Sequence, residues 1–280
     1  MKTIVKLYAR IHHLVHEHLS FNLPGLGFLY RQLKEDFIFP IRGNKMYFNH
    51  KIADNYGRLL NEKFNEPETH LFLDKVFALT EINNFHFVDI GANIGEFLID
   101  YSNHPKISRV SAFEPQAEQI KVLQKSIELN EFKKTDIIPK PVADSTKDLL
   151  FNFSSKNSTA SGITEDTSKG TIVQSTSIDE YFKENIDQEF VFLIDTEGAE
   201  LDIMKGGRNL IQKSNPLIVF EYNHVTKEHF SIEEVQSELG HNYDIYKLDK
   251  KGNLNCNLKN TWNLVAIPKR KVFMPLLPKI

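Results

Sequence analysis

The stretch Phe87-Val88-Asp89-Ile90-Gly91-Ala92-Asn93-Ile94-Gly95 decides the fold. Its apolar start is typical of a buried strand, and its glycines mark a tight turn that leads into a helix. It is not a G-x-G-x-x-G run, because Asn93 occupies the middle position, and without a G-K-[S/T] sequence a phosphate-binding P-loop is excluded. The turn has no Lys or Arg and contains Asp89. It would therefore repel a pyrophosphate and suit a ligand that carries a cation.

The rest of the chain from His86 alternates short apolar runs with helical patterns. Predicted strands cover residues 87–90, 109–113, 190–194 and 217–220. One helix is expected at 116–129, and another follows the strand at 190–194 and runs through Leu210. This alternation predicts a parallel sheet that is covered by helices on both faces. Two further strands, at 243–248 and 262–267, have no helix between them, which predicts an antiparallel pair at the sheet edge. We expect Trp262 to be part of the core there.

The first 84 residues form a separate N-terminal extension in this interpretation. An amphipathic helix near the start is followed by a β-hairpin at 37–48 around Gly43-Asn44 and by a helix that begins at Pro67. The first helix is expected to dock on its own domain or in a dimer, with a membrane surface as the alternative. The catalytic domain is expected at 85–270, and residues 271–280 form a tail.

Composition excludes several classes of protein. The chain of 280 residues is 41% hydrophobic and 25% charged with a net charge of -3, so neither disorder nor nucleic-acid binding is favoured. A single cysteine, Cys256, excludes an intramolecular disulfide. Without a membrane-spanning stretch or a secretory signal, a cytoplasmic location is expected. The histidines His12, His13, His16 and His18 are typical of a solvated helix face, and we predict no bound metal.

Acidic residues follow the predicted strands. They are Asp89, Glu114, Asp195 and Glu221. In an open parallel sheet ligands bind at the carboxyl ends of the strands, so these acids are expected to converge, although each alone could cap a helix. Glu114 lies about 20 residues beyond the glycines, where an acid commonly binds ribose hydroxyls. A ribose together with a cation favours S-adenosylmethionine over NAD.

Three blocks of sequence resemble the FkbM family of S-adenosylmethionine-dependent methyltransferases. They are residues 87–95, Ala112-Phe113-Glu114-Pro115, and Leu193-Ile194-Asp195-Thr196-Glu197-Gly198-Ala199-Glu200. The resemblance runs from about residue 64 to 268. It implies an α/β, Rossmann-like class I methyltransferase fold, mostly parallel, with a C-terminal antiparallel hairpin. It also implies O-methylation of a sugar, a glycan or a secondary metabolite.

The cofactor site is expected to combine the glycine-rich turn with acids on other elements. The predicted cofactor-binding residues are Asp89, Gly91, Asn93, Gly95, Glu114, Glu66 and Asp144. The last two rest on the resemblance, which places Asp144 at the adenine amino group and Glu66 at the amino-acid end of the cofactor. The alternatives are an Asx-turn at Asp144 and a favourable helix N-terminal charge at Glu66.

Transfer of a methyl group to oxygen usually needs a base. Our candidates, in order, are Asp195, Glu197, Glu221 and His224. Helix capping competes with catalysis for the first two, and Glu200 is expected to cap or to position substrate. A lone loop histidine such as His224 is more often solvated. A noncatalytic metabolite-binding module, or an NAD-dependent oxidoreductase, remains the alternative function.

Overall fold

The computed structural model describes residues 7, 8, 11, 15, 35–50, 65–153, 162–164, 166, 168, 170–259 and 262–278. The predicted N-terminal amphipathic helix lies almost wholly outside these residues. The predicted hairpin is confirmed, because β1 (Phe37–Ile41) pairs antiparallel with β2 (Asn44–Phe48). The turn between them holds Gly43 in the left-handed region, with φ +85°.

In the described part of the chain, the main sheet has eight strands in the order β12-β11-β13-β10-β9-β3-β4-β5. The five strands from β10 to β5 run parallel to one another. Their bounds are β3 (Phe85–Ile90), β4 (Ile107–Phe113), β5 (Thr135–Ile138), β9 (Glu189–Ile194) and β10 (Leu217–Glu221). The chain order reverses between β3 and β9, which is where an open α/β sheet binds its ligand.

The C-terminal strands agree with the predicted antiparallel pair. Strand β13 (Asn263–Pro268) lies between β10 and β11 (Tyr243–Leu248) and is antiparallel to both. The short β12 (Leu254–Asn255), which we did not predict, forms the edge. The prediction that Trp262 is a core residue is wrong: it precedes β13 and is 51% exposed.

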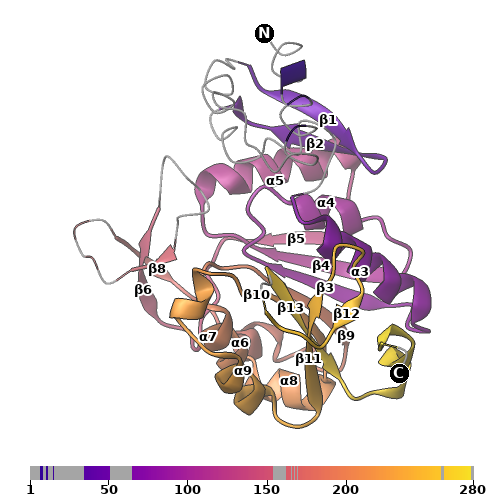
Figure 1. Ribbon diagram of the computed structural model, residues 1–280. Helices are drawn as coiled ribbons and strands as arrows, with labels where there is room; N and C mark the ends of the chain where they lie inside the picture. Colours follow the sequence, from indigo (N-terminus) through magenta and orange to yellow (C-terminus); the bar gives the residue numbers. More distant parts are fainter. Residues whose placement is uncertain are drawn as a thin grey trace.

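Helices cover both faces of the sheet (Figure 1). On one face lie α3 (Pro67–Leu79), α4 (Glu96–Tyr101) and α5 (Ala117–Asn130), and on the other lie α6 (Ile178–Phe182), α7 (Glu200–Lys205), α8 (Arg208–Ser214) and α9 (Ile232–Leu239). Successive strand residues alternate between the two cores. In β9, Val191 and Leu193 join the first core, and Phe192 and Ile194 join the second. The near-continuous apolar runs of the sequence arise from this double burial.

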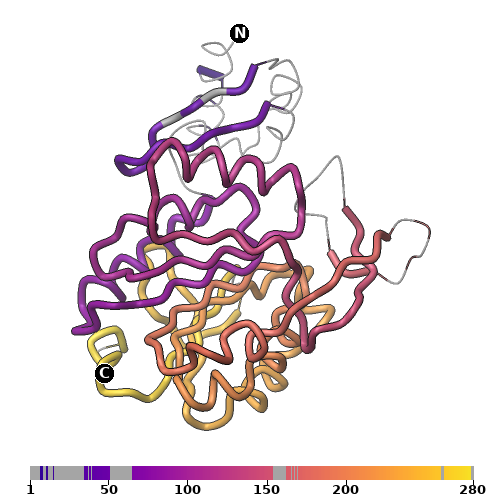
Figure 2. The backbone as a smooth tube through the Cα atoms, turned by 180° about the vertical axis from the view of Figure 1, so that it is seen from behind, coloured from indigo at the N-terminus to yellow at the C-terminus, as the bar shows by residue number. Residues whose placement is uncertain are grey.

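The N-terminal hairpin packs on the same face as α5, as seen from behind in Figure 2. Met46 and Phe48 are fully buried, and the Tyr47 N–H donates to Ser126 Oγ at 3.0 Å. The segment predicted as a tail contains the 3-10 helix η5 (Lys271–Leu276), whose Phe273 is buried in the core that α3 also joins. Both ends of the described chain therefore cover one face of the sheet.

The helix that we predicted to run through Leu210 is interrupted, and this prediction needs correction. It consists of α7 and α8, separated by Gly206 and Gly207. A Cβ atom at Gly206 would overlap the carbonyl oxygen of Ala143. The break is therefore required by the close approach of the α7 end to the segment after β5.

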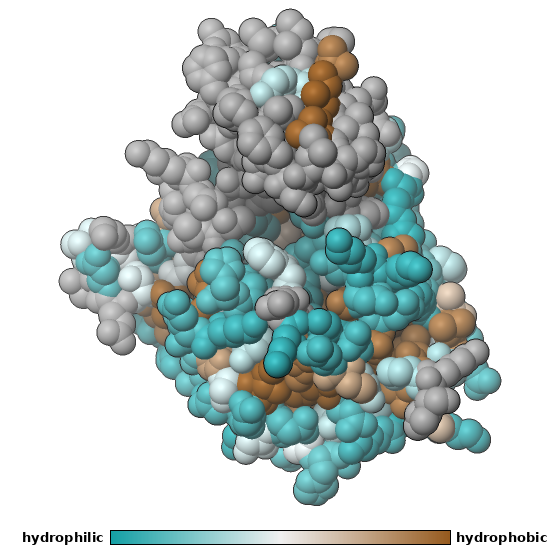
Figure 3. Space-filling model, viewed as in Figure 1, coloured by the Kyte–Doolittle hydropathy of each residue, from teal (hydrophilic) through white to brown (hydrophobic). Residues whose placement is uncertain are grey.

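The face shown in Figure 3 is mostly hydrophilic, with hydrophobic residues confined to patches. Among the residues that the structure describes, no helix is long and apolar enough to cross a membrane.

Candidate active site

The glycine-rich turn connects β3 to α4. The N–H groups of Gly91 and Ala92 both donate to the carbonyl oxygen of Phe113 at 3.0 Å, which ties the turn to the end of β4. Gly91 and Gly95 have positive φ, as does Asn93 (φ +50°). A Cβ at position 91 would overlap the carbonyl oxygen of Asp195, so this position requires glycine. The glycine lets the turn approach the loop after β9.

Glu114, predicted to bind the ribose, also organises the turn. Its two carboxylate oxygens accept hydrogen bonds from the N–H of Asn93 (2.8 Å) and the N–H of Gln116 (2.7 Å). Burial raises the pKa of Glu114 to about 7. The side chain of Gln116 also hydrogen-bonds Glu114. Two carboxylate oxygens offer about four lone pairs, so Glu114 can still accept a hydrogen bond from a ligand.

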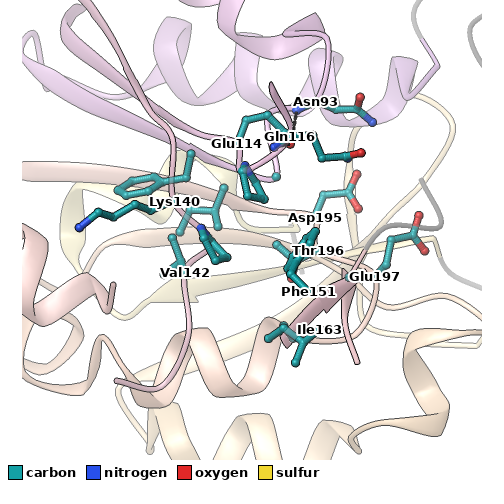
Figure 4. A pocket seen from close by; sticks show the side chains of 17 residues that line it. Asn93, Glu114, Gln116, Lys140, Val142, Phe151, Ile163, Asp195, Thr196 and Glu197 are labelled. Carbon is teal, nitrogen blue, oxygen red and sulfur yellow. Dashed lines mark hydrogen bonds between the residues drawn. The ribbon is translucent and has the colours of Figure 1, made fainter. Parts of the chain in front are cut away.

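A pocket opens over the turn at the carboxyl ends of β3, β4 and β9 (Figure 4). Its acids are Glu114, Asp195 and Glu197, and Lys140 lies on the opposite side from Asp195 and Glu197. Apolar side chains form much of the remaining wall: Ile90, Phe113, Pro115, Pro141, Val142, Phe151 and Ile163. A pocket with an apolar wall and a few convergent polar groups is typical of a small-molecule site.

One wall of this pocket was missed by the sequence analysis. Phe151, Gly162 and Ile163 belong to a three-stranded antiparallel sheet of β6 (Asp148–Asn152), β7 (Gly162–Ile163) and β8 (Thr171–Gln174). The sequence of this region is rich in Ser, Thr and Gly, which is typical of a surface loop. The aromatic run at 151–153 is the signal that could have indicated a wall.

The loop after β9 is held in an unusual conformation by Glu200. Its Oε1 accepts from the N–H of Thr196 (2.9 Å), the hydroxyl of Thr196 (3.0 Å) and the N–H of Gly198 (3.3 Å). Glu197 has φ +58°, a strained value for a side chain other than glycine. Such strain is often found at functional sites. Glu200 therefore positions this loop, and the loop presents Asp195 and Glu197 to the pocket.

Asp195 and Glu221 lie against each other at the ends of neighbouring strands. Burial, and next the charge of Glu221, raise the pKa of Asp195 well above its ordinary value, and the two side chains are close enough to hydrogen-bond when one of them is protonated. Burial, and next the charge of Glu197, raise the pKa of Glu221 to about 8. Asn223 Nδ2 donates to Glu221 Oε1 and fixes this carboxyl group. Two carboxyl groups that share a proton are a recognised acid–base arrangement.

Glu66 approaches this pair from the start of α3. Its carboxylate accepts hydrogen bonds from Asn263 Nδ2 and, at 3.3 Å, from the hydroxyl of Thr69. Burial, and next the charge of Asp195, raise the pKa of Glu66 to about 8. Asn263 was missed by the sequence analysis, since its partner lies 197 residues away in the sequence.

A buried histidine also escaped prediction. His70 lies between Asp100 Oδ2 (2.7 Å from Nδ1) and Glu96 Oε1 (3.3 Å from Nε2) and stacks on Phe97. Burial lowers the pKa of His70, but hydrogen bonds to Asp100 and Glu96 outweigh it, so the net shift is upward. The resulting positive charge lowers the pKa of both Glu66 and Asp89 and so offsets part of the negative charge of the site.

The other predicted residues lie in different surroundings. Asp89 was expected at the end of its strand, but it is buried within β3 and lies outside the pocket lining, and burial raises its pKa to about 7. Asp144 is exposed outside the pocket lining, where it pairs with Lys147 at 2.6 Å and accepts from Ser145 Oγ. His224 is exposed beside Trp262, also outside the lining. The structure thus brings Asp195, Glu221 and Glu66 together and leaves Asp144 and His224 apart.

Among the residues that can be described, no group of three or more His, Cys, Asp or Glu side chains is arranged to hold a metal ion. In the same part of the chain, four buried side-chain oxygens have no hydrogen-bond partner. They are Asp89 Oδ2, Asn93 Oδ1, Glu200 Oε2 and Glu221 Oε2. Glu221 Oε2 gains a donor only when the neighbouring Asp195 is protonated. Buried acceptors without donors are costly, so these atoms indicate the place of a ligand or a proton.

The raised pKa values predict that the chain without ligand loses stability as the pH rises from 6.5 to 9. A carboxyl group with a raised folded-state pKa stabilises the fold fully below its unfolded value near 4.5. That contribution to stability is lost as the pH rises toward the folded-state pKa, which is about 8 for Glu66 and for Glu221. The loss is about 1.4 kcal/mol per pH unit for each group. The raised pKa of His70 likewise makes stability fall as the pH rises.

Urea denaturation at pH 6.5, 7.5 and 8.5 measures this slope. Glu221→Gln removes one titrating group and should make the decline shallower, whereas Asp202→Asn, an exposed change on α7, should not. A free energy of unfolding that is constant or increasing over this range would contradict the assigned shifts.

The region of the chain that builds this site is similar to known proteins. A family model described as the methyltransferase FkbM domain matches residues 89–244. No curated protein matches the sequence. Among solved structures, methyltransferase FkbM from Methylobacillus flagellatus KT aligns with 78% of this chain and 55% of its own, at 16% identity and a TM-score of 0.48. This chain therefore spans about half the length of that protein.

Two other similar structures are those of ligand complexes. TYW2 from M. jannaschii, in complex with AdoMet, aligns with 82% of this chain and 84% of its own, at 13% identity and a TM-score of 0.43. SMU.1697c from Streptococcus mutans, in complex with SAH, aligns with 72% of this chain and 97% of its own, at 13% identity and a TM-score of 0.42.

The family match covers the turn after β3, the acid at the end of β4 and the loop after β9, which are the parts that build the pocket. It spans more than half of the 280 residues. The sheet order, with an antiparallel β13 inserted beside β10, is the class I methyltransferase arrangement that the three sequence blocks predicted. The chain belongs to the FkbM methyltransferase family, whose cofactor is S-adenosylmethionine.

Proposed function

We propose that this protein is an O-methyltransferase that methylates a hydroxyl group of a small molecule or a glycan. The observation that carries the proposal is the buried carboxyl pair of Asp195 and Glu221 at the ends of two parallel strands, with Asp195 in the pocket lining. Methylation of a hydroxyl group releases a proton. A buried carboxylate whose pKa lies near the working pH is well suited to take it.

The pocket fits S-adenosylmethionine by the chemistry of its donors and acceptors. Glu114 offers a remaining lone pair to a ribose hydroxyl, and Asn93 Oδ1, which lies in the pocket lining and has no partner, would accept from an ammonium group. Phe113 and Val142 offer an apolar wall to the adenine ring. When bound, the cofactor supplies an electrophilic methyl group on a sulfonium. The acids around the site stabilise that positive charge.

Each acid has a separate role in this proposal. Glu221, held by Asn223, accepts the proton of the acceptor hydroxyl, and Asp195 stores or returns a proton across the shared hydrogen bond. Glu197 shapes the pocket edge beside them. Because the structure pairs Asp195 with Glu221, the base is better assigned to the pair than to Asp195 alone.

The alternatives are less consistent with this site. NAD would bring two phosphates against Glu114, Asp195 and Glu197, which repel them. A noncatalytic binding module would have no need for a strained Glu197 or a carboxyl pair that is costly to bury. We also propose that the protein is cytoplasmic. The predicted N-terminal amphipathic helix is proposed to contact a second copy of the chain or a membrane surface.

Calorimetry with S-adenosylhomocysteine tests the cofactor site. We expect binding by the parent chain and a rise in its melting temperature, and no such effect of NAD. Glu114→Gln should weaken binding by about 5- to 150-fold, because an acceptor for the ribose hydroxyls is lost at a cost of about 1–3 kcal/mol.

Glu118→Gln is the matched control, since Glu118 is an exposed residue of α5 whose carboxylate pairs with Lys121. The melting temperature of each variant without ligand shows whether Glu114→Gln merely loosens the turn. Equal affinities in two equally stable variants would exclude Glu114 from the cofactor site. Stabilisation by NAD instead of S-adenosylhomocysteine would exclude the proposed function.

A further inference from the structure

His70 is a buried histidine that the proposed mechanism does not use. It lies near the start of α3, and each of its ring nitrogens faces a carboxylate of α4. Nδ1 is 2.7 Å from Asp100 Oδ2, and Nε2 is 3.3 Å from Glu96 Oε1. A neutral imidazole has a single N–H, so it would place one nitrogen lone pair against a carboxylate oxygen. The two carboxylates therefore favour the imidazolium, which donates at both nitrogens.

Glu96 and Asp100 need a cation between them. They lie one turn apart on α4, and their side chains are only 10% and 4% exposed. Like charges at this spacing repel each other, and burial strengthens the repulsion. The imidazolium of His70 lies between them and stacks on Phe97, with 4.2 Å between the ring centroids. It therefore allows α4 to keep both carboxylates in the interior.

The N-terminal hairpin supplies a second cation to the same group. Arg42, in the turn between β1 and β2, donates from Nη1 to Asp100 Oδ2 at 2.8 Å and from Nη2 to Asp74 Oδ2 at 2.7 Å. The hairpin lies against α4 and α5 (Figure 1), and Asn44 Nδ2 also donates to a carbonyl oxygen of α4 at 2.8 Å. Because Asp100 Oδ2 accepts from both Arg42 and His70, these ion pairs connect the hairpin, α4 and α3.

Glu96 extends these contacts to the cofactor site. It is the first residue of α4 and follows Gly95, the last residue of the glycine-rich turn. Its Oε1 accepts from the N–H of Asn65 at 2.8 Å, and its Oε2 accepts from Asn65 Nδ2 at 2.9 Å. Asn65 precedes Glu66, whose carbonyl oxygen accepts from the N–H of His70 at 3.2 Å. Glu96 therefore joins the helix that follows the turn to the chain that carries Glu66.

We propose that His70 is a positioning residue of the cofactor site. As an imidazolium it holds Glu96 in place, and Glu96 fixes the end of the glycine-rich turn against the chain that enters α3. Arg42 completes the arrangement by pairing with Asp100. Neither His70 nor Arg42 lines the pocket, so the N-terminal hairpin contributes to cofactor binding through this buried set of contacts. This role depends on S-adenosylmethionine as the cofactor and not on the identity of the methyl acceptor.

Nitrogen NMR of the histidine rings tests the charge directly. The chain has 11 histidines, and the ring signals of His70 are assigned through its backbone resonances. At pH 7.0, where an ordinary histidine is mostly neutral, we expect both ring nitrogens of His70 to be protonated. His86 is the matched control, because it is equally buried but faces Gln188 and Ser111, and burial lowers its pKa to about 4. It should show one protonated nitrogen, and a neutral His70 would refute the proposal.

Calorimetry with S-adenosylhomocysteine tests the positioning role. His70→Gln keeps an N–H donor but removes the charge, and it should raise the Kd about tenfold, because ligand binding must then order the turn and the chain at Glu66. His86→Gln is the control: it also replaces a buried histidine, but one at the start of β3, the end of the strand away from the turn. It should bind with the Kd of the parent chain.

Variants of Arg42 test the link to the hairpin. Arg42→Met should raise the Kd about two- to fivefold, the effect of a partly exposed ion pair, and Arg42→Lys should restore most of the affinity. Because Arg42 acts through Asp100, Arg42→Met should have little further effect in an Asp100→Asn background. Arg109→Met is the matched control, since Arg109 pairs with Asp136 at the surface, 2.9 Å apart.

Urea denaturation of each variant separates positioning from folding, and the Kd values are compared at a temperature where every variant is folded. If His70→Gln binds as tightly as the parent chain, His70 is only a core residue and the proposal is wrong. It is also wrong if His86→Gln weakens binding as much, since the effect would then follow from lost stability. Additive effects of Arg42→Met and Asp100→Asn would contradict the connection between the hairpin and the cofactor site.

Discussion

Asp195→Asn and Glu221→Gln are each expected to lower turnover by about 10²–10⁴-fold, the usual contribution of a general base. Both substitutions keep the size of the side chain and remove its ability to take a proton. The two groups share one hydrogen bond, so either change leaves the pair unable to accept the proton of the hydroxyl. Because this proton moves only in the transition state, the Kd for S-adenosylhomocysteine should change little.

Glu197→Gln and His224→Ala complete the set of predicted bases, and Asp202→Asn is the surface control. The Asp195→Asn Glu221→Gln double variant should be little worse than either single one if the pair acts as a unit. Parent turnover in both single variants would remove the pair from catalysis. A defect in Glu221→Gln alone would assign the base to Glu221 and leave Asp195 a positioning role.

The parts of the fold that sequence predicted are those with a local signal. The hairpin around Gly43, the start of α3 at Pro67 and the alternation of strands and helices depend on residues close together in the chain. Glu114 was found for a similar reason, because its position follows from the length of one strand–helix–strand unit. The physics that sets these features is backbone geometry and burial over a few residues.

The features that escaped prediction depend on contacts between distant segments. Asn263 acquires its role from Glu66, which lies at the far end of the chain. Trp262 fits the apolar pattern of β13, yet the strand begins one residue later and leaves the indole outside. The break between α7 and α8 is set by the backbone of Ala143. The pattern of apolar residues within one segment does not indicate which residues of a distant segment will pack against it.

Gly91 has a structural role beside the cofactor-binding role that the sequence predicts for it. The structure places the Asp195 carbonyl oxygen where a Cβ of residue 91 would lie. The loops after β3 and β9 are joined there, since the N–H of Asp195 also donates to the carbonyl oxygen of Ile90 at 3.0 Å. The close approach keeps the cofactor turn and the carboxyl pair in one rigid frame.

Gly91→Ala should therefore destabilise the fold by about 3 kcal/mol or more, and Gly91→Val further. An alanine there meets both an unfavourable φ of +88° and an overlap with backbone that cannot move aside. Gly43→Ala is the matched control, because Gly43 has nearly the same φ (+85°) but no described atom within 4 Å of its Cβ position. It should cost only about 1–2 kcal/mol, the price of the left-handed conformation alone.

Urea denaturation of the two alanine variants measures the difference. The overlap predicts that Gly91→Ala is clearly less stable than Gly43→Ala, and that its remaining folded fraction binds S-adenosylhomocysteine more weakly because the turn has been pushed away from Asp195. If the two variants lose the same stability, then backbone strain accounts for both, and the loops after β3 and β9 can separate without cost. The contact at Gly91 would then not be what keeps the cofactor turn and the carboxyl pair in one rigid frame, and the hydrogen bond from the Asp195 N–H to the Ile90 carbonyl oxygen would have to do so alone.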